Sequence, residues 1–370
     1  MIIRIEDDFD LEKIMVSGQC FRVRKMNTGA YRFITGSHIL YIREMEPHMF
    51  ACSCSEEEWD AVWHPYFDLD RDYRAVREKI RCENEFINHA VEMGKGIRVL
   101  LQDPWEMLVT FIISQRKSIP SIAACVEKIA KTAGVPIQAG MPDRSVKDTE
   151  EAGSGEVQNT VIGKGGSGEV QSAETGKGES GEVQNPETGK GGSGEVQSAE
   201  TGKGESGEAQ NTETGKREFE EGQETEIVRE ESGEIKQTEE EIVYRFPTPE
   251  EILAAGEERI AACGLGYRLP YVMRAAEQAL TIDFEALDQL SDEELFRTFT
   301  GFYGVGKKIS NCVCLFAYGR VSRVPVDTWI GKVIREDCGG CDPFPGFGEV
   351  AGIIQQYVFY CARKDKRRPQ

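Results

Sequence analysis

The residues best suited to chemistry lie close together, between positions 299 and 327, in the sequence FTGFYGVGKKISNCVCLFAYGRVSRVPVD. A turn of two glycines, Gly304 and Gly306, precedes two adjacent lysines, Lys307 and Lys308, and Asp327 follows Lys308 by 19 residues. Glycines at a turn that opens a helix let backbone N–H groups approach a phosphate, because a helix N-terminus favours anions. A lysine beside such a turn, with a carboxylate across a cleft, combines a nucleophile, a charge stabiliser and a phosphate contact.

Local patterns predict the elements that position these groups. Ile309, Val313 and Phe316 recur on one face of a helix that runs to Tyr318 and ends at a glycine. Asp327 has the place of an N-cap for a second helix, TWIGKVIRE. From these residues alone two interpretations stay open. The lysine is either a nucleophile or a phosphate contact, and the aspartate is either catalytic or only a helix cap.

Charge is distributed unevenly along the 370 residues, which carry a net charge of −20. Residues 145–242 hold 25 acidic and 9 basic residues, a net of −16, and the remainder holds 64 − 25 = 39 acidic and 44 − 9 = 35 basic residues, a net of −4. The acidity therefore belongs mainly to one segment and does not exclude a polyanion as partner. Residues 363–368 are basic and predict either a polyanion contact or a solvated terminus.

Two features bear on compartment and metal content. The eleven cysteines predict mostly buried thiols in a cytosolic protein, and the single C-x-x-C pair, Cys338 and Cys341, is too little for a zinc or iron–sulfur site. We expect no metal and no cofactor. The N-terminus lacks a signal peptide and no apolar run is long enough for a membrane. These features indicate a cytoplasmic, nucleoid-associated protein of prokaryotic type.

The chain changes character along its length. Short β-rich runs at residues 20–24, 31–34, 38–43 and 49–52 predict a small antiparallel sheet, with a helix near its start. Helical patterns follow, and Asp103 and Pro104 mark the start of a central helix that is apolar all round. The polar residues 114–118 at its end suit either a DNA backbone or a plain helix–helix turn.

Residues 145–242 are of low complexity. Ser-Gly-Glu-Val-Gln recurs with a 13-residue period, with at most one small apolar residue in each repeat. Such a segment cannot bury enough apolar surface to offset its ordering entropy. We predict a disordered insertion that separates two halves of one helical domain, and its partner is not predicted.

Several blocks together resemble a known family, the 8-oxoguanine DNA glycosylases of the helix-hairpin-helix superfamily. The resemblance extends from about residue 17 to residue 363, apart from the insertion. The matching blocks are SGQCFR at residues 17–22, YFDLD at 66–70, LLQDPWEMLVTFI at 100–112, GLGYRLPYV at 264–272, GVGKKISNC at 304–312 and VPVDTW at 324–329.

The resemblance implies an α+β fold with three parts. A small N-terminal antiparallel sheet and its following helices occupy residues 1–98. An all-α helix-hairpin-helix glycosylase domain occupies residues 99–144 and 243–370, interrupted by the disordered insertion at 145–242. It also implies a bifunctional enzyme that excises 8-oxoguanine from duplex DNA and then cleaves the abasic strand, as a monomer without contact to membranes.

Site residues follow from the matched positions. Lys308 takes the place of the Schiff-base lysine and Asp327 that of the catalytic aspartate. The residues placed against the substrate base are Gly18, Cys312, Phe316, Gln355 and Phe359. Those placed against DNA are Arg116, Lys117, Tyr267, Arg268, Gly304, Gly306 and Lys307. Two positions depart from the pattern of the eukaryotic members, Ser121 in place of an arginine and Trp329 in place of a histidine.

Rival functions differ in their residue requirements. A monofunctional alkyl- or adenine-glycosylase needs only the aspartate and water, and Lys308 argues against it. The endonuclease III branch has a four-cysteine cluster that this sequence lacks. A non-catalytic helix-hairpin-helix module needs neither Lys308 nor Asp327. We therefore expect a bifunctional glycosylase.

Overall fold

The computed structural model describes residues 1–137 and 242–364, which belong to one compact unit. The expected disordered insertion, apart from Ile242, and the basic tail beyond residue 364 lie outside the described residues. No helix within the described ranges combines the length and apolar character that crossing a membrane requires. All eleven cysteines are described; they are free thiols and eight of them are buried, which confirms that expectation.

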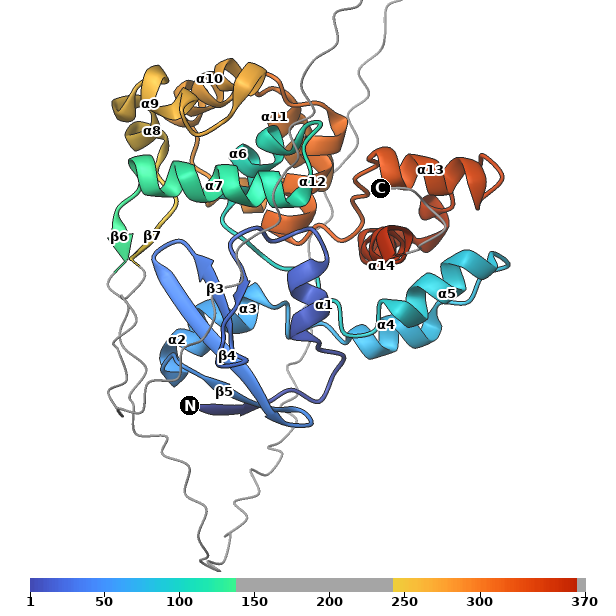
Figure 1. Ribbon diagram of the computed structural model, residues 1–370. Helices are drawn as coiled ribbons and strands as arrows, with labels where there is room; N and C mark the ends of the chain where they lie inside the picture. The colour runs from blue at the N-terminus through green and yellow to red at the C-terminus, as the bar shows by residue number, and fades with distance from the viewer. Residues whose placement is uncertain (138–241, 365–370) are drawn as a thin grey trace, which may run out of the picture. The chain divides into compact units, whose positions relative to one another are not determined.

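The N-terminal part contains the predicted antiparallel sheet (Figure 1). Its strand order is β1-β5-β4-β3-β2, with bounds β1 Ile2–Arg4, β2 Arg24–Lys25, β3 Tyr31–Thr35, β4 His38–Glu46 and β5 Met49–Cys52. The strand expected at residues 20–24 was wrong in extent, since β2 begins only at Arg24. The residues before it are turned towards the helical part, where the Arg22 Nε donates to Glu127 at 2.9 Å.

Short helices complete this part of the chain. They are α1 Leu11–Val16, α2 Glu56–Glu58, a π-helical turn Trp59–Trp63 and α3 His64–Tyr66. Their aromatic side chains share one core with the sheet, in which Phe67 meets the rings of Phe9 and Phe33 edge to face at 5.2 Å. The sheet therefore has a hydrophobic core of its own, distinct from that of the helical part.

The remainder is helical, as predicted (Figure 1). The helices are α4 Tyr73–Lys79, α5 Glu85–Met93, α6 Pro104–Ser114, α7 Ile119–Ala133, α8 Pro249–Ala255, α9 Glu257–Ala261, α10 Leu269–Ala279, α11 Asp292–Thr300, α12 Lys307–Tyr318, α13 Thr328–Glu336 and α14 Ala351–Lys364, with 3-10 turns η2 Gly266–Arg268, η3 Ala286–Gln289 and η4 Phe344–Val350. Helix α6 is the predicted central helix, since residues 105–113 are all buried. The Asp103 carboxylate caps it by accepting from the Glu106 N–H at 2.7 Å.

The chain leaves and re-enters the fold at adjacent points. Strand β6, Pro136–Ile137, pairs antiparallel with β7, Val243–Tyr244. The Arg245 N–H then donates to the Val135 carbonyl at 2.9 Å. This short ladder, which the sequence patterns did not predict, fixes both ends of the segment between residues 137 and 243.

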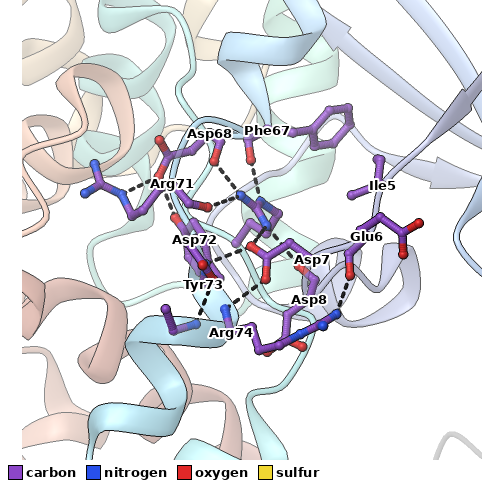
Figure 2. Close-up of polar contacts among 12 residues, drawn as sticks. Ile5, Glu6, Asp7, Asp8, Phe67, Asp68, Arg71, Asp72, Tyr73 and Arg74 are labelled. Atoms are coloured by element: carbon purple, nitrogen blue, oxygen red, sulfur yellow. Dashed lines mark hydrogen bonds and ion pairs between the residues drawn. The ribbon is translucent and has the colours of Figure 1, made fainter. Parts of the chain in front are cut away.

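A buried arginine joins the two parts of the described chain. Asp7, Phe67 and Asp68, which all bind this arginine, lie close together in Figure 2. Arg98 is fully buried and its guanidinium stacks 4.1 Å from the Tyr73 ring centroid. Its N–H groups donate to the carbonyls of Phe67 at 2.8 Å, Asp8 at 3.0 Å, Asp68 at 2.5 Å and Arg71 at 2.8 Å, and to the Asp7 carboxylate at 2.8 Å.

This arginine also fixes the strand-like segment that follows it. The Gln19 side chain donates to the Arg98 carbonyl at 2.8 Å and accepts from the Leu100 N–H at 2.8 Å. The Gln102 amide donates to the Gln19 carbonyl at 3.0 Å. Buried polar groups satisfied in this way hold their backbone rigidly. Gly18, directly before Gln19, is thereby held in place.

Candidate active site

The helix-hairpin-helix turn lies between α11 and α12. Gly304 has φ +81°, and a Cβ there would meet the Tyr271 ring at 2.6 Å, so glycine is required on both counts. Gly306 is the N-cap of α12 and offers no side chain to its first N–H groups. Gly304, Gly306 and Lys307 are exposed, which leaves this helix end accessible to an anion.

Lys308 points towards α6 and not into solvent. Its Nζ donates to the Ser114 Oγ at 3.3 Å and lies 4.9 Å from the centroid of the Phe111 ring. Phe111 in turn stacks on Phe316, with ring centroids 5.5 Å apart. Phe316 is as deeply buried as Phe111, and its expected contact with the substrate base stays a prediction. The amine thus rests between an aromatic face and a hydroxyl group.

Cys312 lies one helical turn beyond Lys308. Burial raises the pKa of this thiol to about 11, and the positive charge of Lys308 opposes the rise. Cys312 is therefore a neutral thiol at neutral pH. A buried neutral thiol is a small, polarisable surface suited to an aromatic ring.

Asp327 begins α13 as predicted. Its Oδ1 accepts from the Ile330 N–H at 2.9 Å, which makes it the N-cap of the helix. Burial raises the pKa of this carboxyl above its ordinary value, whereas the hydrogen bond from Ile330 and the charge of Lys308 lower it. Lys308 and Asp327 therefore act on each other electrostatically, and the capping role leaves the second carboxylate oxygen available.

Helix α14 contains the expected base-contacting residues Gln355 and Phe359, of which Phe359 lies beside Gly18. Gln355 is buried, and its Oε1 accepts from the Gln356 Nε2 at 3.0 Å. Gly18 has φ +86°, and a Cβ there would lie 2.8 Å from Phe359 Cε1 and 3.1 Å from Ile119 Cδ1. A side chain at position 18 would therefore displace Phe359 or Ile119.

A second group of predicted residues gathers around the end of α6. The Gln115 carbonyl accepts from the Tyr267 hydroxyl at 3.3 Å and from the Arg268 Nε at 2.8 Å. Arg268 is buried, so it supports the turn and stacks on Tyr267, 4.2 Å from its ring centroid. Tyr267 is half exposed. Gln115 also donates to the Gly304 carbonyl at 3.3 Å, which links this turn to the hairpin.

The loop after α6 contains the remaining predicted DNA contacts. Arg116 has φ +54°, a left-handed conformation that is strained for a residue with a side chain. The Lys117 Nζ donates to the Gly264 carbonyl at 2.8 Å, which draws the loop towards the turn before Tyr267. Lys117 therefore has a structural partner, whereas its expected contact with DNA stays a prediction.

A hollow of about 510 Å³ lies elsewhere, and none of the predicted site residues lines it. Its charged groups are largely paired with one another, as in the 2.7 Å contact between Arg77 Nε and Asp8 Oδ2. The Lys13 ammonium likewise donates to the carbonyls of Met93 and Lys95. The predicted catalytic residues lie elsewhere, Lys308 on α12 against α6 and Asp327 at the start of α13, and their catalytic roles stay predictions.

Phe111 and Ile119, next to the site, were not predicted from the sequence, and Ser114 was noted only within the polar residues 114–118. Phe111 and Ser114 lie three positions apart on α6, and this spacing places both on the face towards Lys308. Ile119 opens α7 against Gly18. Phe111 and Ser114 form the surface against which the amine lies. The spacing of Phe111 and Ser114 could be read from the sequence, but the sequence did not show that α12 and its Lys308 would face them.

A helix-hairpin-helix turn with an inward lysine, an aspartate helix cap and an adjoining antiparallel sheet define a DNA glycosylase-like fold. Residues 1–108 match the family described as "8-oxoguanine DNA glycosylase, N-terminal domain". The family match to residues 1–108 agrees with the resemblance drawn from the sequence blocks.

Individual proteins similar to this chain have names of the same kind. A probable N-glycosylase/DNA lyase of Methanothermobacter thermautotrophicus is 26% identical over 115 residues, which are 28% of this chain and 37% of that protein. The matched stretch thus covers little more than a third of that relative. Two solved structures share the fold over nearly the whole length. MBOgg1 with a low-affinity DNA ligand is 24% identical, with a TM-score of 0.66 over 98% of this chain and 95% of that chain. The Clostridium acetobutylicum 8-oxoguanine glycosylase/lyase with DNA containing cytosine opposite 8-oxoguanine is 22% identical, with a TM-score of 0.65 over 99% of this chain and 98% of that chain.

Proposed function

We propose that this protein is a bifunctional DNA repair enzyme that excises 8-oxoguanine from duplex DNA and cleaves the resulting abasic strand. The main supporting observation is the position of Lys308, whose amine lies against Phe111 and Ser114 and interacts with the charge of Asp327. The N-terminal family match and the glycosylase/lyase relatives favour the same activity.

The chemistry begins with extrusion of the damaged nucleotide from the stack, which costs on the order of a few kcal/mol. The neutral Lys308 amine attacks the sugar C1′ as the bond to the base breaks, and the base leaves with the bonding electrons and gains a proton. Positive charge develops on the sugar during this step, and the Asp327 carboxylate stabilises it. The ammonium formed at C1′ passes one proton to the departing base. The C1′–O4′ bond then breaks, O4′ takes a proton from solvent, and the nitrogen lone pair forms a protonated imine between Lys308 and C1′. Loss of a C2′ proton then expels the 3′ phosphate by β-elimination.

Recognition of the base divides among four residues. The Cys312 thiol and the Phe359 ring face the two sides of a purine, and the Gln355 amide binds its Watson–Crick edge. None of these contacts separates guanine from 8-oxoguanine, because both present the same Watson–Crick edge and the same ring faces. The difference lies at N7, which is an acceptor in guanine and a donor in the lesion.

The Gly18 carbonyl supplies the complementary acceptor. It accepts from the N7–H of 8-oxoguanine, whereas with guanine it faces a lone pair and stays unpaired. A buried unpaired acceptor costs about 1–3 kcal/mol, which is about one to two decades of discrimination. The tight packing of Phe359 and Ile119 around Gly18 holds this backbone close to the base.

The proposed contacts with DNA are assigned by the exposure of each residue. The exposed turn at Gly304, Gly306 and Lys307 suits a phosphate, and the exposed Tyr267 suits the gap left in the stack. Arg268 acts through Tyr267 and Gln115, because its guanidinium is buried. Arg116 and Lys117 flank this gap from the loop after α6.

Incubation of the full chain with an 8-oxoguanine duplex, with and without borohydride, tests this function. We expect base release, a nicked strand ending in a β-elimination product, and a covalent protein–DNA adduct in the presence of borohydride. Base release without nicking or adduct would identify a monofunctional glycosylase. Binding without base release would identify a non-catalytic DNA-binding module, and both outcomes would overturn the proposal.

Lesion specificity has its own test. Single-turnover excision is compared on duplexes with 8-oxoguanine, 8-oxoadenine or undamaged guanine opposite each of the four bases. We expect excision of 8-oxoguanine to be the fastest. Equal rates on 8-oxoguanine and on a purine without an N7–H would contradict the role of the Gly18 carbonyl.

A further inference from the structure

Helix α14 presents a charged residue, Arg363, on the face that contains Gln355 and Phe359. Arg363 follows Phe359 by four residues, and Phe359 follows Gln355 by four, so the three side chains lie on one face of the helix. The sequence patterns include Arg363 only in the basic stretch 363–368, and the family blocks assign it no contact with the base. The contacts of Arg363 place it beside Gly18, whose carbonyl is proposed to bind the base.

The guanidinium of Arg363 lies directly against Gly18. Its Nη1 donates to the Val16 carbonyl at 3.0 Å and lies 3.2 Å from the position that a Cβ on Gly18 would take. Its central carbon lies 5.4 Å from the Phe359 ring centroid. Val16, Gly18, Phe359 and Arg363 therefore form one cluster, which draws together residues from both ends of the described chain.

Most of the hydrogen-bonding capacity of Arg363 is uncommitted. A guanidinium has five N–H donors in a fixed plane, and within the described residues the contact with Val16 uses one of them. The side chain is half-buried, so its remaining donors are partly shielded from water. Hydrogen bonds from a charged donor in such surroundings are roughly twice as strong as neutral ones.

We propose that Arg363 is a specificity-determining residue that donates a hydrogen bond to the C8 oxygen of the extruded base. This inference rests on the proposed function and on the Gly18 carbonyl as acceptor of N7–H. The C8 oxygen is adjacent to N7 on the same edge of the base. A donor that lies against Gly18 therefore meets this oxygen when the Gly18 carbonyl meets N7–H.

The Gly18 carbonyl and the Arg363 guanidinium together match the two positions, N7 and C8, at which 8-oxoguanine differs from guanine. 8-Oxoguanine presents a donor at N7 and an acceptor at C8, which match a carbonyl and a guanidinium side by side. Guanine presents an acceptor at N7 and a C–H at C8, so it satisfies neither group. A hydrogen bond to a charged group of this kind corresponds to a rate or affinity difference on the order of 10- to 100-fold.

Arg363→Met tests the proposal, because methionine keeps an unbranched apolar stem and removes every donor. Lys364→Met is the matched control, since it removes one positive charge from the next, exposed position of the same helix. For each protein, single-turnover excision of 8-oxoguanine is divided by the rate of strand cleavage at a preformed abasic site, which has no base to recognise. We expect this ratio to fall about 10- to 100-fold in Arg363→Met and to change less than about two-fold in Lys364→Met.

A second substrate separates contact with the base from support of the backbone. 8-Thioguanine keeps the N7–H and places sulfur, a weaker acceptor, at C8. Loss of a hydrogen bond to C8 predicts a larger decrease on 8-oxoguanine than on 8-thioguanine. Equal decreases on both bases would show that Arg363 only holds Val16 and Gly18 in place, and an unchanged ratio would show no role; each result overturns the proposal. Wild-type protein inactive on both 8-oxoguanine and abasic DNA would instead contradict the proposed function.

Discussion

Lys308 Nζ donates a 3.3 Å hydrogen bond to Ser114 Oγ, and these two residues lie on opposite sides of residues 138–241 in the sequence. The candidate site is thus assembled from two separate stretches of chain. The β6–β7 ladder holds the two stretches together where they enter and leave the fold. The described residues therefore join the two halves of the site at this ladder.

Replacement of residues 145–241 by a short Gly/Ser linker should therefore leave excision and thermal stability close to those of the full chain. The strands β6 and β7 already close the loop, and loop-closure entropy changes only slowly with length. Removal of the strongly acidic repeats should also raise the rate of association with DNA at low salt, because their charge repels phosphates. Stopped-flow binding at two salt concentrations measures this, and loss of folding or of excision would show that the repeats are structural.

Arg98→Met should destabilise the protein strongly. The substitution removes the donor to the carbonyls of Phe67, Asp68 and Arg71. It also removes the charged partner of the Asp7 carboxylate, which keeps the N–H groups of Tyr73 and Arg74 as donors. Loss of one partner from a buried charged network costs about 3–5 kcal/mol. Urea denaturation measures the loss.

The control for this prediction is Arg74→Met, a change of the same kind at an exposed neighbour that should cost less than about 1 kcal/mol. Similar unfolding free energies for Arg98→Met and wild type would contradict the view that the hydrogen bonds of the Arg98 guanidinium stabilise the fold.

The excision rate should show an acidic limb set by Asp327. The carboxylate stabilises positive charge and its protonated form does not, so the rate falls about ten-fold for each pH unit below its pKa. Burial raises that pKa above its ordinary value, which moves the limb to higher pH than for an exposed aspartate. Single-turnover rates between pH 4 and pH 8 test this.

Asp327→Asn separates catalysis from helix capping. Asparagine is as good an N-cap as aspartate, so α13 and the fold should persist. Loss of the charge should reduce excision by on the order of 10²- to 10³-fold and remove the acidic limb. Near-wild-type excision by this variant would show that Asp327 serves only as a cap.

Local chemistry in the sequence was enough to predict the elements that position the site. Asp103 and Pro104 predicted the start of α6, and Gly319 and Asp327 predicted the end of α12 and the start of α13. Capping and turn residues act within a few positions of themselves, so their effect is visible in a short window of sequence.

Contacts between distant segments were not predictable in this way. The strand expected from Cys20 was wrong because Gln19 and Arg22 are held by Arg98, Leu100 and Glu127, far along the chain. The pairing of β6 with β7 and the packing of Arg363 against Gly18 have no local signature either. Arg268 was expected at the DNA, and only the fold shows that the Gln115 carbonyl engages its guanidinium.

The central claim is that Lys308, not its neighbour Lys307, forms the covalent bond with DNA. The direct measurement is borohydride trapping on an 8-oxoguanine duplex, followed by proteolysis and mass-spectrometric location of the modified lysine. We predict that the adduct maps to Lys308, that Lys308→Gln yields no adduct and no base release while folding normally, and that Lys307→Gln, which alters an exposed residue, still yields the adduct. A normal adduct in Lys308→Gln, or an adduct located at Lys307 in the wild type, would contradict this account.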